Sequence, residues 1–153
     1  MILNNIYQIL SYNNWANQRL VRNVNKVTDA DYYKIQPIPF NNIHGLLSHL
    51  LYYDTKYYQK LAPELNTSII ENKHTRAYIA ENILLSSSNW IHWIEKFMDI
   101  NPLPTFSEEI AKNIFDLSIH SSYHRGQINI ILSVIDYKPE SLDIFLFNDS
   151  VAE

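Results

Sequence analysis

Cysteine is absent from this chain of 153 residues, and glycine occurs only at Gly45 and Gly126. Without cysteine the protein has no disulfide, no thiolate ligand and no thiol nucleophile of its own, so nitrogen and oxygen atoms must hold any bound metal. Two glycines are too few for the many tight turns of a sheet-rich fold, and they exclude a glycine-rich phosphate loop. A helical protein is therefore the first expectation.

Strong charge and long apolar runs are also missing. The formal net charge is −4 at pH 7, and the basic residues are scattered, so we expect no nucleic-acid partner. No segment approaches the roughly 20 apolar residues that cross a bilayer, and the start of the chain lacks the pattern of a signal peptide. We expect a cytoplasmic protein without membrane contact, folded as one domain over residues 1–153.

Four segments carry apolar residues at the spacing of amphipathic helices. They run from about residue 3 to 27, from Asn41 or Asn42 to about 61, from about 79 to 97, and from Ser107, the expected N-cap, to about 135. The pattern predicts an all-α four-helix bundle, a fold that places metal and ligand sites between facing helices. The apolar tail from residue 137 to 153 is expected to pack on the bundle or on a second subunit.

Three histidines form the candidate site. His120 and His124 lie four residues apart in an apolar row of the last helix, so both side chains project from one face. A buried imidazole must satisfy two ring nitrogens, and the neighbouring isoleucines and leucines offer no partner. His49, on the second helix, is the candidate third ligand. Three imidazoles leave one position of a divalent ion open, as in catalytic zinc sites. The alternative is three core histidines that bind no metal.

Other polar residues fit more than one interpretation. Asp116 lies four residues before His120, where it is either a carboxylate that orients or replaces a metal ligand, or a solvated acid. Asn13 and Asn17 interrupt the apolar row of the first helix, and they face either the site or water. The remaining histidines are interpreted as surface or capping residues: His44, His74 and His92.

Several sequence blocks resemble the DinB family of helical-bundle metalloproteins. They are YNNWANQRL near the start, FNNIHGLLSHLLYYD on the second helix, HSSYHRGQI on the fourth and DIFLF near the end. The resemblance implies a four-helix bundle, often a homodimer, that binds zinc or nickel through the three matching histidines, here His49, His120 and His124. One departure is the short connector between Asp99 and Ser107, where many members carry a longer insertion.

The resemblance also implies a type of chemistry. Better-understood relatives are S-transferases and isomerases that use a low-molecular-weight thiol, such as bacillithiol or mycothiol, as cosubstrate. The leading hypothesis is therefore a metal-dependent thiol S-transferase or hydrolase acting on a small molecule. The alternative is a non-catalytic metal-binding stress-response protein whose site stabilises a dimer. No general base stands out, although Asp116, Tyr53 and Asp54 lie near the ligands in sequence. Arg125 anchors either helix packing or an anionic substrate, and the structural role is the favoured interpretation.

Overall fold

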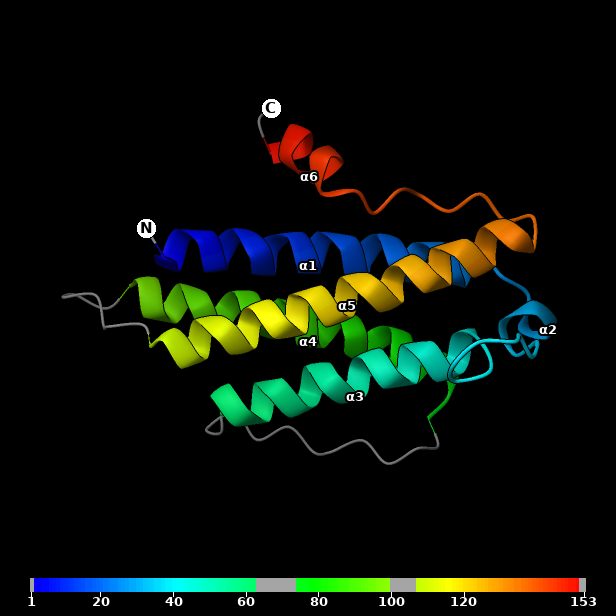
Figure 1. Ribbon diagram of the computed structural model, residues 1–153, viewed down its shortest axis with the longest axis horizontal. Helices are drawn as coiled ribbons and strands as arrows, with labels where there is room; N and C mark the ends of the chain where they lie inside the picture. Colours follow the sequence, from blue (N-terminus) through cyan, green and yellow to red (C-terminus); the bar gives the residue numbers. More distant parts are fainter. Residues whose placement is uncertain (1, 63–73, 100–106, 152–153) are drawn as a thin grey trace.

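Four long helices run along the length of the molecule in the computed structural model, which describes residues 2–62, 74–99 and 107–151. The long helices are α1 (Ile2–Asn25), α3 (Ile43–Leu61), α4 (Arg76–Met98) and α5 (Glu108–Val134). Two short helices are α2 (Asp29–Tyr32), between α1 and α3, and α6 (Ile144–Val151), near the C-terminus (Figure 1). The described segments contain no strand.

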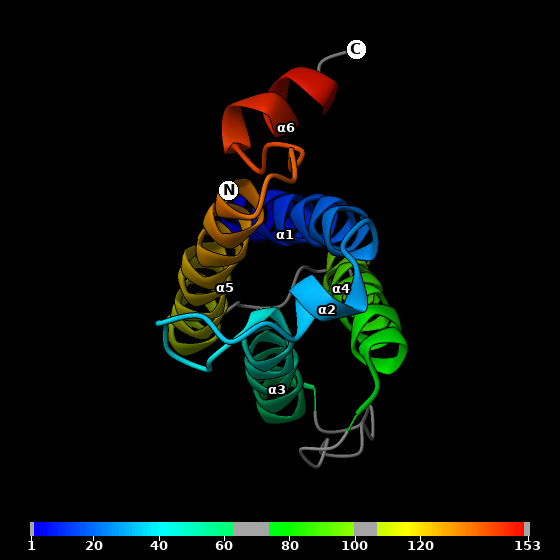
Figure 2. The same ribbon diagram turned by 90° about the vertical axis from the view of Figure 1, so that its right-hand side faces the viewer.

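The long helices pack as the four corners of a bundle. Helices α1 and α3 each contact both α4 and α5. The view along the helices places α1 and α3 at opposite corners, with α4 and α5 between them (Figure 2). This arrangement confirms the predicted all-α four-helix bundle. None of the helices in the described ranges has the length and apolarity to cross a membrane.

Side-chain caps fix where three of the long helices begin. Asn42 accepts a hydrogen bond from the Gly45 amide at α3, Thr75 does so from Tyr78 at α4, and Ser107 from Ile110 at α5. Each cap satisfies one of the amide groups left unpaired at a helix N-terminus. The structure thus chooses Asn42 over Asn41 and confirms Ser107. The short connector between α4 and α5 falls largely on residues 100–106, which lie outside the described residues.

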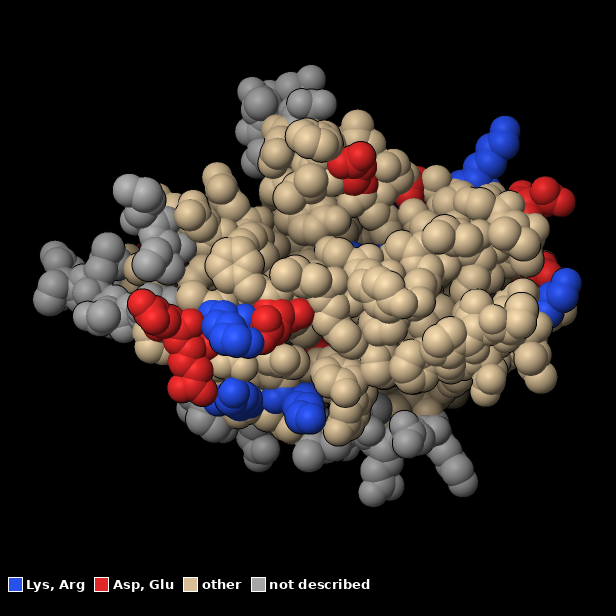
Figure 3. Space-filling model, in the orientation of Figure 1, with Lys and Arg blue, Asp and Glu red and all other residues tan. Residues whose placement is uncertain are grey.

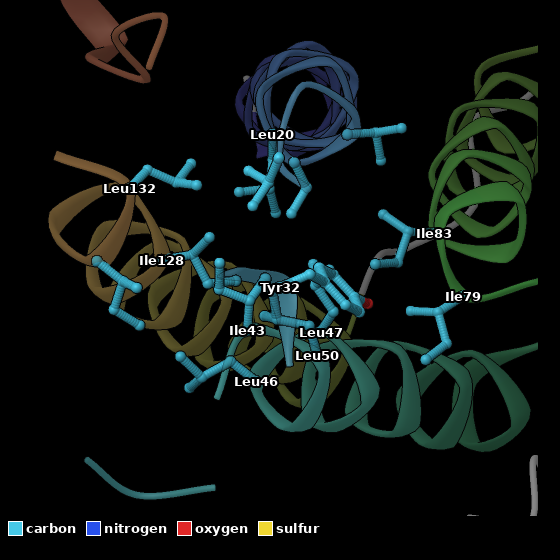
Figure 4. Close-up of a cluster of buried hydrophobic side chains, with 14 of the residues drawn as sticks. Leu20, Tyr32, Ile43, Leu46, Leu47, Leu50, Ile79, Ile83, Ile128 and Leu132 are labelled. Carbon is cyan, nitrogen blue, oxygen red and sulfur yellow. The ribbon is translucent and has the colours of Figure 1, made fainter. Parts of the chain in front are cut away.

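The interior consists of two apolar clusters. The cluster nearer α2 is built on residues such as Leu20, Ile43, Leu47 and Ile128, which point toward one another between the helices (Figure 4). The other cluster contains the indole rings of Trp90 and Trp93. The interior also contains buried polar residues, among them Asn13, Ser118, Ser121 and Arg125.

The C-terminal segment packs on α1, so the first of the two expectations for the tail is confirmed. The Tyr12 hydroxyl donates to the carbonyl oxygen of Leu142 at 2.8 Å. The Phe147 ring lies edge-on against Tyr12 and Trp15 of α1, with ring centroids 5.9 and 5.7 Å apart. Glu140 forms a two-pronged ion pair with Arg22. These contacts hold α6 over the outer side of α1.

Candidate metal centre

Helices α3 and α5 bring three imidazole rings together. His49 comes from α3, and His120 and His124 come from successive turns of α5. One ring nitrogen of each lies within 4.8 Å of the others, and the Nε2 atoms of His49 and His120 are 3.1 Å apart. The three side chains are therefore positioned to bind one metal ion, which is the arrangement that the sequence predicted.

Burial keeps two of these imidazoles neutral. The pKa of His49 is lowered to about 4, first by burial and then by the electrostatic effect of His124 and His120. The pKa of His120 is lowered by burial and by His124. Both rings are therefore unprotonated at pH 7, which is the form that binds metals. Their partial exposure also leaves the cluster open to solvent on one side.

Gln127 fixes the orientation of the third imidazole. The Nδ1 atom of His124, whose side chain is buried, lies 2.8 Å from the Oε1 atom of Gln127. Because an amide oxygen only accepts hydrogen bonds, Nδ1 is the donor of this pair and Nε2 is left available as a ligand atom. A partner of this kind on the second nitrogen is typical of histidines that bind metals. The sequence pattern assigned Gln127 no role, although its spacing from His124 by one helical turn was visible.

The arrangement fits a divalent ion chemically. Two nitrogens that bind the same zinc ion at about 2.0–2.1 Å are at most roughly 4.2 Å apart, so the observed separations require only small side-chain adjustments. At 3.1 Å, the Nε2 atoms of His49 and His120 either share the N–H of one neutral ring in a hydrogen bond or have a bound cation between them. In the described part of the chain, the group contains no carboxylate. The donor set is thus three imidazole nitrogens, which suits zinc or nickel.

The two proposed supporting residues lie in different environments. Asp116 forms a short ion pair with Lys112 on the outer surface of α5, as expected for a solvated acid. Asn17 accepts a hydrogen bond from Arg125 at 3.0 Å and donates one to Ser87 at 2.8 Å. Asn17 therefore contacts the neighbour of His124 in the sequence rather than an imidazole.

Comparison with known proteins gives the family of this chain. The model of the DinB family matches residues 1–101, which is about two thirds of the sequence. The chain belongs to the DinB family. No curated protein and no solved structure was found to match it. The matched DinB segment includes His49 and ends before α5, so the assignment of His120 and His124 to the site rests on their geometry around His49.

A buried arginine next to the DinB histidines ties α5 to α1. Arg125 is 1% exposed, and its guanidinium donates to Asn13 at 2.8 Å, to Asn17 at 3.0 Å and to Ser122 at 3.0 Å. The amide of Asn13 in turn donates to Ser118 at 2.7 Å. These bonds explain why two asparagines interrupt the apolar row of α1, and they support the structural role expected for Arg125.

Of the other candidate residues, Tyr53 contacts the rings of His49 and His120, whereas the rest lie apart from the imidazole cluster. The carboxylate of Asp54 accepts a hydrogen bond from the Trp90 indole at 3.0 Å, and burial raises its pKa. His44 contacts the Tyr32 hydroxyl, His74 stacks on Tyr78, and His92 is 76% exposed. The exposure of His92 matches the interpretation of these histidines as surface or capping residues, whereas His44 and His74 pack on tyrosine side chains.

Proposed function

We propose that this chain is a metal-dependent enzyme of the thiol S-transferase or hydrolase type that acts on a small molecule. His49, His120 and His124 are the proposed ligands of one zinc or nickel ion. The observation that carries the proposal is the convergence of three imidazole nitrogens within 4.8 Å, with Gln127 bonded to the far nitrogen of His124. Three ligands leave a coordination position for a substrate or cosubstrate.

The residues of this chain have different roles at the proposed metal site. A divalent ion bound there would lower the pKa of a thiol or water beside it. His49 and His120 supply neutral nitrogens at pH 7 because burial lowers their pKa values. Gln127 orients His124. Since the chain has no cysteine, a reacting thiol must come from a cosubstrate of low molecular weight.

The exposure of the site favours an enzyme over a purely structural metal site. Structural zinc sites are closed by four protein ligands, whereas this cluster has three. His49 and His120 are partly exposed, and Phe40, the ring closest to His49, is itself 40% exposed. A small molecule can therefore reach the imidazoles. This accessibility is the reason to prefer catalysis over the non-catalytic alternative.

Metal content tests the proposal directly. Protein purified without an affinity tag should contain close to one zinc or nickel ion per chain by elemental analysis. The variants His120→Ala and His124→Ala should lose it, whereas His92→Ala, which removes an exposed histidine of α4, should retain it. Wild-type protein that is free of metal and gains no thermal stability from added zinc or nickel would overturn the proposal and leave three core histidines.

The thiol and hydrolase versions differ in what binds to the ion. In a cobalt(II)-substituted protein, a bound thiolate gives an intense sulfur-to-metal absorption band in the near ultraviolet, which bound hydroxide does not. Titration with a low-molecular-weight thiol should therefore produce this band in wild type and not in His120→Ala if the thiol version is correct. A spectrum that stays unchanged at millimolar thiol would favour the hydrolase version.

We also propose that the protein forms a homodimer through the outer side of α5. Its exposed apolar side chains recur at spacings of four and seven residues, and we name them the α5 outer row: Phe115, Ile119, Tyr123, Ile130 and Val134. Figure 3 shows that charged side chains on this face gather toward the ends of the molecule and leave its middle mostly uncharged. Large exposed apolar surfaces of this kind are typical of protein interfaces.

A further inference from the structure

Three aromatic rings from three places in the sequence surround the imidazole cluster. Phe40, in the loop before α3, lies over His49 with ring centroids 4.1 Å apart and is 5.8 Å from His124. Tyr53 of α3 lies 4.8 Å from His49 and 4.6 Å from His120. Tyr123 of α5 lies 5.0 Å from His124. A molecule that approaches the imidazoles therefore meets aromatic surfaces from several sides.

The backbone holds Phe40 in an unusual conformation. Phe40 and Asn41 have φ angles of 67° and 66°, which a bulky side chain rarely adopts and which persists only where the surroundings enforce it. Four backbone hydrogen bonds hold this turn, among them one from the Gln36 amide to the Asn41 carbonyl at 2.6 Å. Phe40 is thus placed by its loop rather than by apolar burial, since its side chain remains 40% exposed.

Gly45 makes the close approach of this loop possible. A Cβ atom added at Gly45 would lie 2.1 Å from the carbonyl oxygen of Phe40 and 3.0 Å from its Cβ atom. Gly45 lies one helical turn before His49 on α3, so the missing side chain lets Phe40 rest directly beside the ligand histidine. The strained loop, Gly45 and the ring of Phe40 together form one wall of the site.

The aromatic character of this wall determines which kind of ligand binds best. The rings of Phe40 and Tyr53 offer flat apolar surfaces, and aromatic pairs with centroids 4.5–7 Å apart attract one another beyond their shared burial. Among the described residues, Lys56 is the one cation in contact with either of these two rings. Its ammonium lies 5.5 Å from the Tyr53 centroid. Flat apolar groups that stack on these rings therefore gain favourable contacts here.

We propose that Phe40 is a specificity-determining residue that makes the histidine site prefer ligands with an aromatic group next to the metal-binding atoms. The inference rests on the proposed function, because it concerns molecules that occupy the open position of the metal. It assigns a class of substrate, an aromatic or similarly flat and apolar small molecule. Phe40 acts on binding through its ring, and Gly45 acts on Phe40 by leaving room for its backbone.

Two hydroxamates provide a matched test. Acetohydroxamate and benzohydroxamate bind a metal through the same two oxygens and differ in a methyl against a phenyl group. Their dissociation constants can be measured by titrating the cobalt(II)-loaded protein and following its visible spectrum. Wild type should bind benzohydroxamate at least about fivefold more tightly than acetohydroxamate, the size expected for one favourable ring contact. In Phe40→Leu this ratio should fall to about one or two, with metal content unchanged.

Two further variants separate the role of the ring from a general loss of stability. Phe145→Leu makes the same change at an exposed phenylalanine of α6 and should keep the wild-type ratio. Gly45→Ala should lower the ratio without altering residue 40, because the added methyl group displaces the Phe40 backbone. The melting temperature of each variant shows whether the bundle is still folded.

The outcomes distinguish this inference from the function on which it rests. Wild type that binds cobalt yet shows equal affinity for the two hydroxamates overturns the role of Phe40 and leaves the metal site standing. A ratio that is unchanged in Phe40→Leu has the same meaning. Wild type that binds no metal overturns both proposals, and metal content measured before the titrations identifies that case.

Discussion

Gln127 illustrates how one side chain decides which nitrogen of a histidine is free. Its amide oxygen lies 2.8 Å from Nδ1 of His124, so removing it frees the ring to rotate and to change its tautomer. Gln127→Leu should weaken zinc affinity by about 10- to 100-fold, the usual effect of losing such a partner. Competition with a chromophoric chelator measures this affinity.

The matched variant Gln127→Glu should keep wild-type affinity, since a carboxylate also accepts the Nδ1 hydrogen bond. Equal affinities in Gln127→Leu and wild type would show that His124 needs no second contact.

The neutral histidines make the stability of the metal-free protein depend on pH. A histidine whose folded pKa lies below its unfolded value binds more protons after unfolding, so acid favours the unfolded state. For His49 the window extends from 6.5, its ordinary pKa, down to about 4. The melting temperature of metal-free protein should be highest above this window and should fall as the pH is lowered through it.

The variant His49→Leu should show a smaller fall in melting temperature over the same pH range, because it lacks the group that takes up the proton. His92→Ala should retain the full fall, since that side chain is 76% exposed. Identical pH profiles in wild type and His49→Leu would show that protonation of His49 does not cause the acid destabilisation.

The sequence predicted the histidines of the site but not the residues that surround them. The spacing of His120 and His124 within an apolar row made a shared site predictable, because helix geometry alone brings residues four apart onto one face. Phe40 gave no such signal, since its position depends on a positive φ angle that apolar periodicity does not encode. Packing of the loop backbone on Gly45, five residues further along the chain, decides it.

At the scale of elements, the buried network around Arg125 links α5 to α1. Removing the guanidinium leaves the carbonyl oxygens of Asn13 and Asn17 without their donor. Leaving buried amide acceptors without their donor typically costs about 1–3 kcal/mol. Arg125→Met should therefore lower the free energy of unfolding by roughly this amount, measured by urea denaturation.

The triple variant Arg125→Met, Asn13→Leu and Asn17→Leu should recover part of this loss, because it replaces the whole network with apolar side chains. A cost below about 1 kcal/mol for Arg125→Met alone would mean that water replaces the lost hydrogen bonds.

The limits of the long helices could be predicted from the sequence, whereas the contacts between residues of different helices could not. Apolar periodicity and the Ser107 cap set the limits of α5 to within a residue or two, because these signals are local. The orientation of Asn13 and Asn17 stayed open in the sequence because it depends on Arg125, more than 100 residues away. Helix α2 was missed since its four residues are too few to show a period.

At the scale of the whole molecule, the α5 outer row is an exposed apolar row on the described part of the chain. Its five side chains are 45–72% exposed, although their position on a bundle helix would allow charged residues. An interface of standard size buries about 800 Å² on each partner, and this row would supply its apolar centre. Gly126 lies on the same side of α5 with no atom within 4 Å of an added Cβ, which permits a second helix to approach closely.

If α5 packs against α5 of a second copy, a charge in the row disrupts both halves of the interface at once, since a two-fold contact repeats every residue. Ile130→Lys should therefore convert the dimer into a monomer of 18.0 kDa, measured by light scattering after size exclusion. Ile35→Lys introduces the same charge at a residue that is 79% exposed in the loop after α2 and should leave the dimer intact. A wild-type mass of one chain at high micromolar concentration would reject the dimer, whereas a dimer that survives Ile130→Lys would assign its interface to another face, such as the exposed side of α6.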